Sequence, residues 1–330
     1  MHYEYIFYIK KEKMSNKQPE VYFYVPYADV LQVREDEEKY TYANGIASRR
    51  KFLKSPLNYI GGKYKLLPQL IEFFPEKINT FVDLFSGGFN VGINVDCNKV
   101  VCNDMNTFII DLYKELYSKP IDETLNKITG RINEYGLSKE NEEAFKKFRN
   151  YYNKTKEPID LYTLSCYSFN YQFRFNNNKE YNNPFGRNRS QFSDNMKSNL
   201  ILFTEKLKSM NVEFLSEPFD KVDLSKLNSE DFVYCDPPYL ITTGSYNDGN
   251  RGVKDWKEEE EIQLYKVLDE LNKRKVKFAL SNVIEHKGKE NILLKEWSKK
   301  YKTIYLTSDY SNSSYNTKRD KSIEVLIINY

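Results

Sequence analysis

Short apolar runs alternate with longer segments of helical periodicity over most of the chain. The runs have the length and the β-branched or aromatic content of buried strands, and they lie at 80–85, 99–104, 231–235, 276–281, 303–306 and 323–328. Apolar residues recur at helical spacing in the segments 66–74, 109–149, 196–210, 257–273 and 291–300. Strands separated by helices predict an α/β fold in which a mostly parallel sheet has helices on both faces.

Two stretches lack this alternation. Residues 1–50 are polar and aromatic-rich, and residues 165–195 are rich in aromatics, Asn and Arg, without sustained periodicity. Because the second stretch interrupts the strand–helix pattern, we expect an inserted domain, which we place at residues 121–210. A glycine- and asparagine-rich loop is expected at 242–252, and a helix is expected to begin after Gly88.

Composition narrows the classes of function. Of the 330 residues 40% are hydrophobic, yet no apolar run approaches the ~20 residues that span a bilayer, so we expect no membrane segment. The start, Met1 to Lys13, lacks the cleavage pattern of a secretory signal, and Met14 is an alternative start. Four cysteines without a C-x-x-C pair and only two histidines argue against a metal site and disulfides, and favour a reduced, cytoplasmic setting. Catalysis would therefore use carboxylates, backbone groups and an external reagent.

The tetrapeptide Asp236-Pro237-Pro238-Tyr239 directly follows the predicted strand 231–235. Each proline lacks an N–H and has its φ fixed at about −65°, so the carbonyl oxygens here have few local donors and project outward. An acid, an outward carbonyl and an aromatic ring suit a flat ligand whose exocyclic amine donates two hydrogen bonds while its face stacks. The alternative is a strand-ending turn whose acid caps the next helix. We take these four residues as candidate catalytic residues.

Two further acids, Asp83 and Asp104, follow predicted strands. Ligands of such sheets bind at the carboxyl ends of the strands, and glycines such as Gly87 let the backbone approach them closely. Asp104 comes about 20 residues after Asp83, the spacing at which an acid meets ribose hydroxyls. The segment 83–88 is not a full phosphate fingerprint, and its carboxylate would repel a pyrophosphate but attract a cation. S-adenosylmethionine fits this combination, and an ordinary strand–glycine–helix junction is the alternative.

The order of these motifs resembles one family closely, the Dam-like DNA adenine methyltransferases, which include solitary enzymes and the modification partners of type II restriction systems. The resemblance rests on Tyr59-Ile60-Gly61-Gly62-Lys63, the segment 83–88, Asp104, the aromatic-rich insert and the tetrapeptide 236–239. It extends from about residue 55 to the C-terminus, where the segments 313–317 and 324–330 are also similar to the family. It implies a Rossmann-like S-adenosylmethionine-dependent methyltransferase fold with an inserted, mainly helical and hairpin DNA-recognition domain.

The resemblance also implies roles for segments and residues. Residues 1–54 would be an N-terminal extension, 55–120 and 211–330 the catalytic domain, and 121–210 the target-recognition domain. The residues expected to bind the cofactor are Tyr59 (in place of a family tryptophan), Lys63, Asp83, Phe85, Gly87, Asp104 and Asp236. The residues expected to bind DNA are Phe169 as an aromatic wedge, Arg174 as the guanine-reading side chain, and Asn170, Pro184 and Arg187. Family members often have Gly or another small residue where Tyr171 stands.

The function implied by the resemblance is methyl transfer from S-adenosylmethionine to the 6-amino group of a flipped adenine in double-stranded DNA, at a specific site. The expected enzyme is a monomer, with a dimer as the alternative, and it needs neither metal nor membrane. An RNA adenine methyltransferase and a catalytically degenerate DNA-binding module stay open, and an NAD-dependent oxidoreductase is more distant because the glycine fingerprint is incomplete. The net charge of +3 permits nucleic-acid binding without requiring it, and the insert on its own is equally typical of an aromatic core with solvated arginines.

Overall fold

The computed structural model describes residues 41–43, 46–48, 51–242, 256–306 and 322–330. The chain divides into two units, Met1–Lys51 and Phe52–Tyr330. In the first unit the described residues form two short antiparallel strands, β1 (Thr41–Ala43) and β2 (Ile46–Ser48). The expected loop at 242–252, apart from Thr242, and the family-like segment 313–317 lie outside the described residues.

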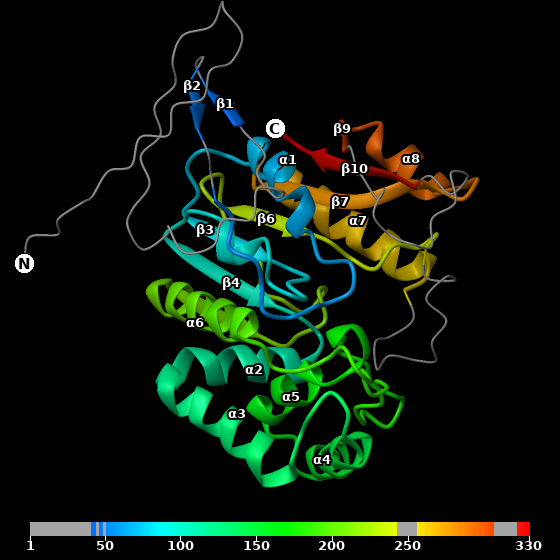
Figure 1. Cartoon of the computed structure of the whole chain (residues 1–330). Coiled ribbons are helices and arrows are strands. Elements are labelled where there is room, and N and C mark those ends of the chain that lie inside the picture. Colours follow the sequence, from blue (N-terminus) through cyan, green and yellow to red (C-terminus); the bar gives the residue numbers. More distant parts are fainter. Residues whose placement is uncertain (1–40, 44–45, 49–50, 243–255, 307–321) are drawn as a thin grey trace, which may run out of the picture. The chain divides into compact units, whose positions relative to one another are not determined.

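The second unit contains an eight-stranded sheet in the order β5-β4-β3-β6-β7-β10-β9, with the short strand β8 paired to β7 (Figure 1). Neighbours from β5 to β7 are parallel, whereas β10 is antiparallel to both β7 and β9. The strands span Thr80–Asp83 (β3), Lys99–Asn103 (β4), Val212–Leu215 (β5), Phe232–Cys235 (β6), Lys277–His286 (β7), Lys289–Glu290 (β8), Lys302–Leu306 (β9) and Ser322–Ile328 (β10). The α/β prediction with a mostly parallel sheet is confirmed.

Helices connect most of these strands. They span Leu67–Glu72 (α1), Thr107–Ser118 (α2), Ile121–Tyr135 (α3), Glu142–Thr155 (α4), Pro158–Cys166 (α5), Asp194–Ser209 (α6), Glu258–Lys273 (α7) and Ile292–Ser298 (α8). Short turns of 3-10 helix span Tyr64–Leu66 (η3), Gly92–Asn94 (η4) and Phe169–Tyr171 (η5). The helices α2 to α5 lie together beyond α6, on the side of the sheet that carries β4 (Figure 1).

The sheet has an apolar core on each face, because neighbouring side chains of a strand point to opposite faces. In β6, Phe232 and Tyr234 pack into a core with α1, α2 and α6, whereas Val233 and Cys235 pack into a second core with α7 and α8. A strand covered on both faces is apolar at every position instead of alternating. This is why the run 231–235 predicts a buried strand from sequence alone.

Two helix predictions were wrong in detail. The pattern at 109–149 divides into α2, α3 and α4: Lys119, which precedes Pro120, is extended, and Gly136 ends α3 with a left-handed φ of 64°. The helix expected after Gly88 is only the turn η4, and Phe89 before it has a φ of 56°, which a helix cannot contain.

Sequence periodicity also missed β5 and the helix α5. Every residue of α5 after Pro158 is buried, so this helix has no polar face that would give a period. It is buried because α2, α3 and α4 all contact it. Its residues Leu161 and Leu164 belong to the same apolar core as Phe81 of β3. The helices that precede the irregular loop between α5 and α6, the predicted recognition loop, are therefore packed continuously with the sheet.

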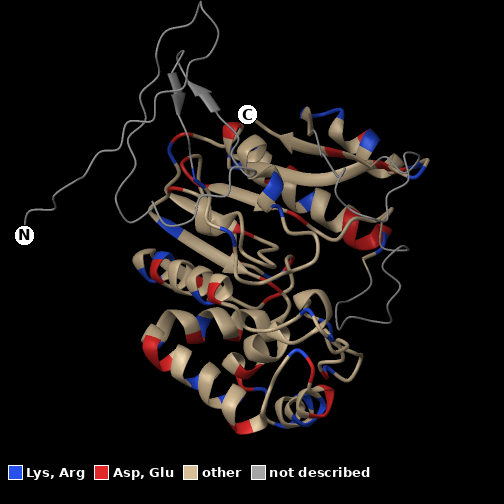
Figure 2. Cartoon of the chain, in the orientation of Figure 1, with Lys and Arg blue, Asp and Glu red and all other residues tan. Residues whose placement is uncertain are grey.

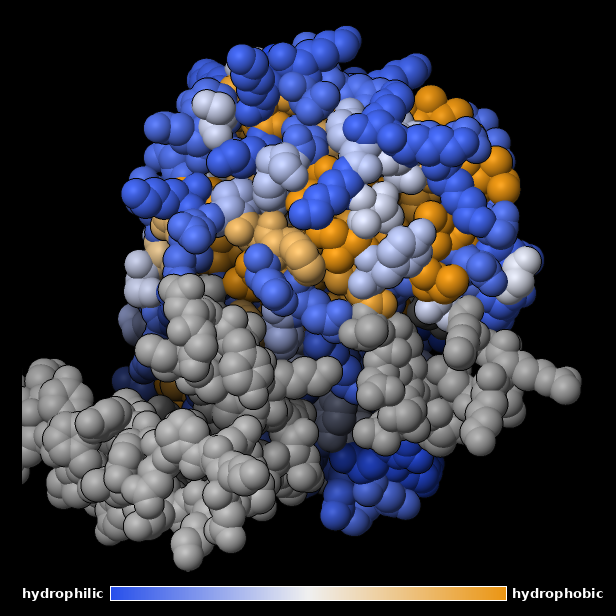
Figure 3. Space-filling model, turned by 90° about the horizontal axis from the view of Figure 1, so that it is seen from above, coloured by the Kyte–Doolittle hydropathy of each residue, from blue (hydrophilic) through white to orange (hydrophobic). Residues whose placement is uncertain are grey.

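The surface of the described residues is mixed. Figure 2 shows Lys and Arg interspersed with Asp and Glu along the helices, which agrees with the small net charge of +3. On the face seen in Figure 3, hydrophobic side chains gather near the middle and hydrophilic ones surround them. None of the described helices is long and apolar enough to cross a membrane.

Candidate active site

The strand order reverses between β3 and β6, and the candidate acids lie at this point of the sheet. Asp83 is the last residue of β3, Asp104 follows β4, and Asp236 follows β6. Because these three strands are parallel neighbours, their carboxyl ends meet at one edge. Ligands of open α/β sheets bind outside the carboxyl ends of the strands at such a switch point.

The Asp236 carboxylate is held on both of its oxygens. Lys63 Nζ lies 2.9 Å from Oδ2, and the Tyr239 hydroxyl donates to Oδ1 at 2.8 Å. Lys63 Nζ also lies 5.0 Å from the centre of the Tyr239 ring and donates to the Gly61 carbonyl at 2.9 Å. The three side chains therefore form one closed cluster, in which the Asp236 side chain is 17% exposed.

Burial and the Lys63 ammonium shift the pKa of Asp236 in opposite directions. Burial raises the pKa of the Asp236 carboxyl, and the neighbouring Lys63 ammonium opposes this rise; the net pKa stays above its usual value. Burial beside Asp236 raises the pKa of the Tyr239 phenol well above its usual range, so this hydroxyl stays a donor. Lys63 reaches the cluster because Gly61 turns the chain with a φ of 80° just before η3.

A second group of contacts holds the loop after β3. The Gly87 N–H donates to Asp104 Oδ2 at 2.8 Å, and the Tyr113 hydroxyl donates to the Gly87 carbonyl at 2.7 Å. Gly87 has a φ of 45°, and a Cβ there would lie 3.0 Å from Cδ1 of the Tyr59 ring. Only glycine allows this contact between the aromatic ring and the backbone. Burial raises the pKa of Asp104, whose other oxygen accepts the Asn106 N–H at 2.8 Å.

Asp83 lies deeper in the same edge than the other two acids. Its side chain is 1% exposed, and Oδ2 accepts the Gly92 N–H at 3.1 Å. Burial, together with the negative charges of Asp236 and Asp104, raises its pKa to about 8. The residue Phe85, two positions later, is half-buried. The edge thus gathers three carboxyls, of which Asp236 is paired with Lys63, and an additional cation there is favoured over an anion.

The predicted DNA-binding residues lie on the irregular loop between α5 and α6. Phe169 is 41% exposed, and its N–H donates to the Pro184 carbonyl at 2.7 Å. Asn170 has a φ of 52°, and its carbonyl accepts the Asn58 side-chain amide at 2.7 Å. Asn58 directly precedes Tyr59, so the loop is connected by a hydrogen bond to the motif that is predicted to bind the cofactor.

The other residues of this loop that the sequence singled out, Arg174, Arg187 and Tyr171, differ in their contacts and backbone conformation. The Arg174 carbonyl accepts the Asn182 N–H at 3.0 Å, and its side chain is half-buried. Arg187 forms an ion pair with Glu142 of α4. Tyr171 has a φ of 55°, the region that glycine enters most easily, which gives a physical reason for the small residue that family members have there.

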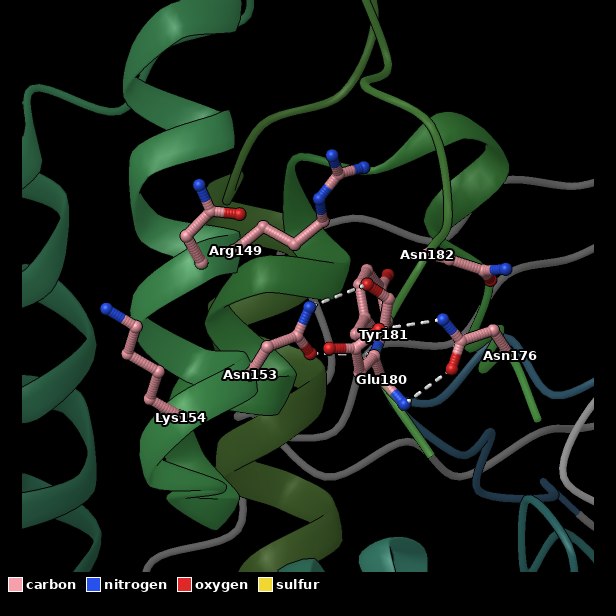
Figure 4. Close-up of a pocket in the computed structure, with 8 residues that line it drawn as sticks. Arg149, Asn153, Lys154, Asn176, Glu180, Tyr181 and Asn182 are labelled. Carbon is pink, nitrogen blue, oxygen red and sulfur yellow. Dashed lines mark hydrogen bonds between the residues drawn. The ribbon is translucent and has the colours of Figure 1, made fainter. Parts of the chain in front are cut away.

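A polar pocket of about 470 Å³ lies between α4 and this loop. Figure 4 shows the hydrogen bonds of Asn153 in α4 with Tyr181 and of Asn176 with Glu180. The pocket is also lined by the basic side chains of Arg149 and Lys154. Sequence analysis did not single out these two residues, because charged residues on the exposed face of an amphipathic helix are common. The same is true of Asn58 and Tyr113, whose contacts span long distances in sequence.

Sequence comparisons agree with the geometry. A family model described as D12 class N6 adenine-specific DNA methyltransferase matches residues 59–312. The chain is 56% identical to the Type II methyltransferase M.FokI of Planomicrobium okeanokoites, over 99% of this chain and 48% of the relative. It is 54% identical to the Modification methylase StsI of Streptococcus sanguinis, over 86% of this chain and 44% of the relative.

The chain spans about half the length of these two relatives. A DNA adenine methylase of Escherichia coli (strain K12) is 27% identical over 86% of this chain and 96% of its own length. The match of the family model covers both the sheet edge with its acids and the recognition loop. The resemblance drawn from the motifs is confirmed: the chain belongs to the D12 class N6 adenine-specific DNA methyltransferases.

Proposed function

We propose that this chain transfers a methyl group from S-adenosylmethionine to the 6-amino group of a flipped adenine, at a specific short sequence of double-stranded DNA. The observation that carries the proposal is the Asp236 carboxylate, held between Lys63 and Tyr239 at the switch point of the sheet. This cluster combines a carboxylate, a donor-poor backbone and an aromatic ring, which are the groups that an adenine 6-amino group and ring require.

The residues at the sheet edge suit S-adenosylmethionine. Its sulfonium and ammonium groups are cations, and the carboxyls of Asp83, Asp104 and Asp236, whose pKa values are raised by burial, would be favoured in their ionised form by a cation bound beside them. The Tyr59 ring against Gly87, where a side chain would collide, offers an aromatic wall beside the backbone. Asp104 would bind the ribose hydroxyls, and Lys63, Phe85 and Asp236 would complete the site. When bound, the cofactor supplies an electrophilic methyl group.

The protein's own part is to make a poor nucleophile reactive. The lone pair of the adenine 6-amino group is delocalised into the ring, so the amine must be held and reshaped before it attacks. The two N–H groups of the amine would donate hydrogen bonds to the Asp236 carboxylate and to the Pro237 carbonyl. These hydrogen bonds favour an sp³ nitrogen whose lone pair is free to attack. The raised pKa of Asp236 suits a carboxylate that takes up the proton lost from the amine.

The closed cluster has a consequence for base entry. Tyr239 donates to the same carboxylate that the adenine would use, so its hydroxyl must leave Asp236 Oδ1 when the base arrives. The freed ring would then stack on the adenine, with Pro238 completing the rigid turn below it. The base must leave the duplex to reach this site, which costs a few kcal/mol, and the new contacts at Asp236 and Tyr239 offset part of that cost.

The recognition loop would supply the sequence preference. Phe169 is exposed and can fill the gap left by the extruded base, and Arg174 can pair bidentately with guanine O6 and N7. Asn170, Pro184 and Arg187 would position the loop on the duplex. Arg149 and Lys154 at the polar pocket would contact backbone phosphates, which adds affinity without sequence preference.

The partner is double-stranded DNA, bound by a monomer in the cytoplasm of the cell that holds it. The printed names of two relatives, a Type II methyltransferase and a Modification methylase, support a modification role beside a restriction enzyme, and a solitary or phage methylase is the alternative. The exposed Phe169 and the polar contacts of its loop favour duplex DNA as the substrate, with the target base extruded from the helix.

The test is transfer of a labelled methyl group to duplex DNA and to duplex RNA of the same sequence. Nucleosides from the digested products are then separated. The proposal predicts N6-methyladenine in DNA, and none when Asp236 is replaced by Ala. Label in RNA alone would assign an RNA adenine methyltransferase, and label in neither polymer would contradict the proposed function.

A further inference from the structure

Glu261, in the first turn of α7, is 0% exposed. The Trp256 indole N–H donates to its Oε2, and three more donors converge on Oε1: the Tyr265 hydroxyl at 2.7 Å, the Asn282 amide at 3.0 Å and the Asn291 amide at 3.1 Å. A carboxylate only accepts hydrogen bonds, so four donors satisfy it in full. The start of a helix also favours a negative side chain.

These donors come from separate parts of the fold. Asn282 lies in β7, Asn291 caps the start of α8 through the Leu294 N–H, and Tyr265 lies one turn further along α7. Trp256 precedes α7 and is the first described residue after the stretch that contains the tetrapeptide and is described as far as Thr242. Through these hydrogen bonds Glu261 connects the indole of Trp256 to β7 and to the start of α8.

The Trp256 ring in turn contacts the candidate cofactor site. Its centre lies 5.7 Å from the Phe85 ring in an edge-on arrangement and 5.5 Å from the Phe219 ring. Phe85 and Phe219 lie 5.5 Å apart, so the three rings form one cluster. Phe85 and Phe219 are half-buried and Trp256 is buried, and Phe85 lies two residues after Asp83, which ends β3 at the candidate site.

We propose that Glu261 is a positioning residue for the cofactor site: it holds Trp256 against Phe85 and so fixes the ring that contacts the cofactor. The inference rests on the proposed function, because it takes Phe85 as a cofactor contact. Nothing in the sequence motifs of the chain points to Glu261 or Trp256. Their role follows from the chain of contacts that runs from the Glu261 carboxylate to Trp256 and then to Phe85.

The variant Glu261→Gln breaks this chain at one point. Its amide keeps one acceptor oxygen, which three donors hold at the Oε1 position, so the new NH2 group faces the Trp256 N–H. Two donors then oppose each other, and the buried indole N–H loses its acceptor, which is unfavourable. The side chain keeps its shape, so the indole is released while the rest of the core stays packed.

Asp269 offers a matched control in the same helix. It accepts the N–H of the other tryptophan, Trp297, at 2.9 Å, and the Tyr301 hydroxyl at 2.6 Å. These contacts lie further along α7, and among the described residues the Trp297 ring packs on Tyr265, Phe278 and Tyr301. The variant Asp269→Asn keeps the oxygen that Trp297 and Tyr301 contact, and its NH2 group faces the Lys300 ammonium, which lies 2.8 Å from Oδ2. It therefore disturbs a carboxylate of the same helix without releasing the Trp256 indole.

The experiment compares wild type, Glu261→Gln and Asp269→Asn by calorimetric titration with S-adenosylmethionine, by methylation kinetics and by thermal unfolding. We expect Glu261→Gln to raise the Kd and the KM for the cofactor about tenfold, with kcat at saturating cofactor within about twofold of wild type. Asp269→Asn should lower Tm and leave the cofactor Kd at the wild-type value.

A cofactor Kd for Glu261→Gln that equals the wild-type value would overturn the inference and leave the proposed function standing. Wild type that binds no S-adenosylmethionine would overturn the proposed function and the inference with it. If Glu261→Gln does not fold, Trp256→Phe tests the same contact, since it keeps an aromatic ring and loses the N–H; its Kd should rise by a few-fold. An unchanged Kd in that variant would contradict the inference equally.

Discussion

At the tetrapeptide 236–239 the groups proposed to act on the base are enclosed and bonded to one another, whereas on the loop 169–189 the groups proposed to read DNA reach the surface. Asp236 has both oxygens occupied, by Lys63 and Tyr239. Phe169 is 41% exposed, and the Arg189 guanidinium lies 5.3 Å from its ring centre. The groups proposed to act in catalysis must therefore give up contacts with one another when the substrate binds. The groups proposed to read DNA are already exposed and can contact it directly.

The two regions also differ in what holds them. The tetrapeptide follows a strand buried on both faces, so its position is set by the sheet. The loop has little regular structure, and side chains fix its backbone: the Asn183 amide lies 3.0 Å from the carbonyls of both Phe169 and Gln172. A Cβ at Gly186 would collide with the Ser168 carbonyl at 2.8 Å, so only glycine fits there. The sheet thus positions the groups proposed to act in catalysis, and a few polar contacts, which sequence changes can alter, position the groups proposed to read DNA.

The largest effect should follow from removing the carboxylate of the enclosed site. Asp236→Ala should lower kcat by about a thousandfold or more, because the amine loses its main acceptor. The matched control is Asp231→Asn at the other end of the same strand, where the carboxylate accepts the Thr80 N–H at 2.9 Å. This control should lower Tm and leave kcat intact, and more than 10% residual activity in Asp236→Ala would sink the assigned role.

A smaller effect is expected when the partner of that carboxylate is removed. Lys63→Met should lower kcat about a hundredfold at neutral pH, because the pKa of the buried Asp236 rises further when the opposing ammonium is gone. The acid limb of the pH–rate profile should therefore move to higher pH, and Lys63→Arg, which keeps the charge, should move it back. An acid limb that stays at the wild-type pH in Lys63→Met would show that the pair does not tune Asp236.

On the recognition loop the expected effect is on preference rather than on rate. Arg174→Ala should reduce discrimination at one guanine by about 1–3 kcal/mol, measured as relative kcat/KM on duplexes that differ at single positions. Arg149→Ala at the polar pocket is the control: it should weaken binding to all duplexes alike and reduce the salt dependence. An unaltered preference profile in Arg174→Ala would assign base reading to another residue.

The smallest effect concerns the deepest acid. Asp83 has a pKa raised to about 8 in the folded chain, while the unfolded chain has the ordinary value of 3.8. Between these values the folded state binds more protons, so the stability that Asp83 contributes at low pH is lost as pH rises through about 8. Thermal melts from pH 5 to 9 should show this slope in wild type and a flatter one in Asp83→Asn.

The same acid should couple proton release to cofactor binding. A cation bound nearby favours the ionised carboxylate, so the affinity for S-adenosylmethionine should rise a few-fold between pH 6 and 9. Asp83→Asn should abolish this rise. An affinity that is constant over this range in wild type would place the cofactor's positive charge away from Asp83.

Much of the enclosed site could be predicted because its determinants are local in sequence. A buried strand followed by Asp236-Pro237, and a strand followed by Gly87 with Asp104 after the next strand, each specify a place in a parallel sheet. The pairing of Lys63 with Asp236 joins distant segments, and no local pattern contains it. The sequence does not single out Glu261 for a related reason: it is one of four consecutive glutamates at the start of a helix.

The recognition loop was less accessible to sequence reasoning. Its aromatic residues have no period, and their positions depend on polar contacts such as that of Asn58 with the Asn170 carbonyl. The left-handed φ of Tyr171 cannot be inferred from a tyrosine, which rarely adopts it. The helix α5 behind the loop is buried on all sides and so lacks the amphipathic pattern by which helices are recognised. Only the resemblance to the family indicated what this region does.

The most direct test of the account is a map of methylated adenines. The chain is incubated with S-adenosylmethionine and unmethylated bacterial genomic DNA, beside Asp236→Ala, and single-molecule sequencing locates 6-methyladenine. The account predicts one enriched short motif with wild type and no modification with the variant. Methylation spread over unrelated sequences would contradict the role of the recognition loop, and no modification by wild type that still binds S-adenosylmethionine would contradict the central claim that this site methylates adenine in DNA.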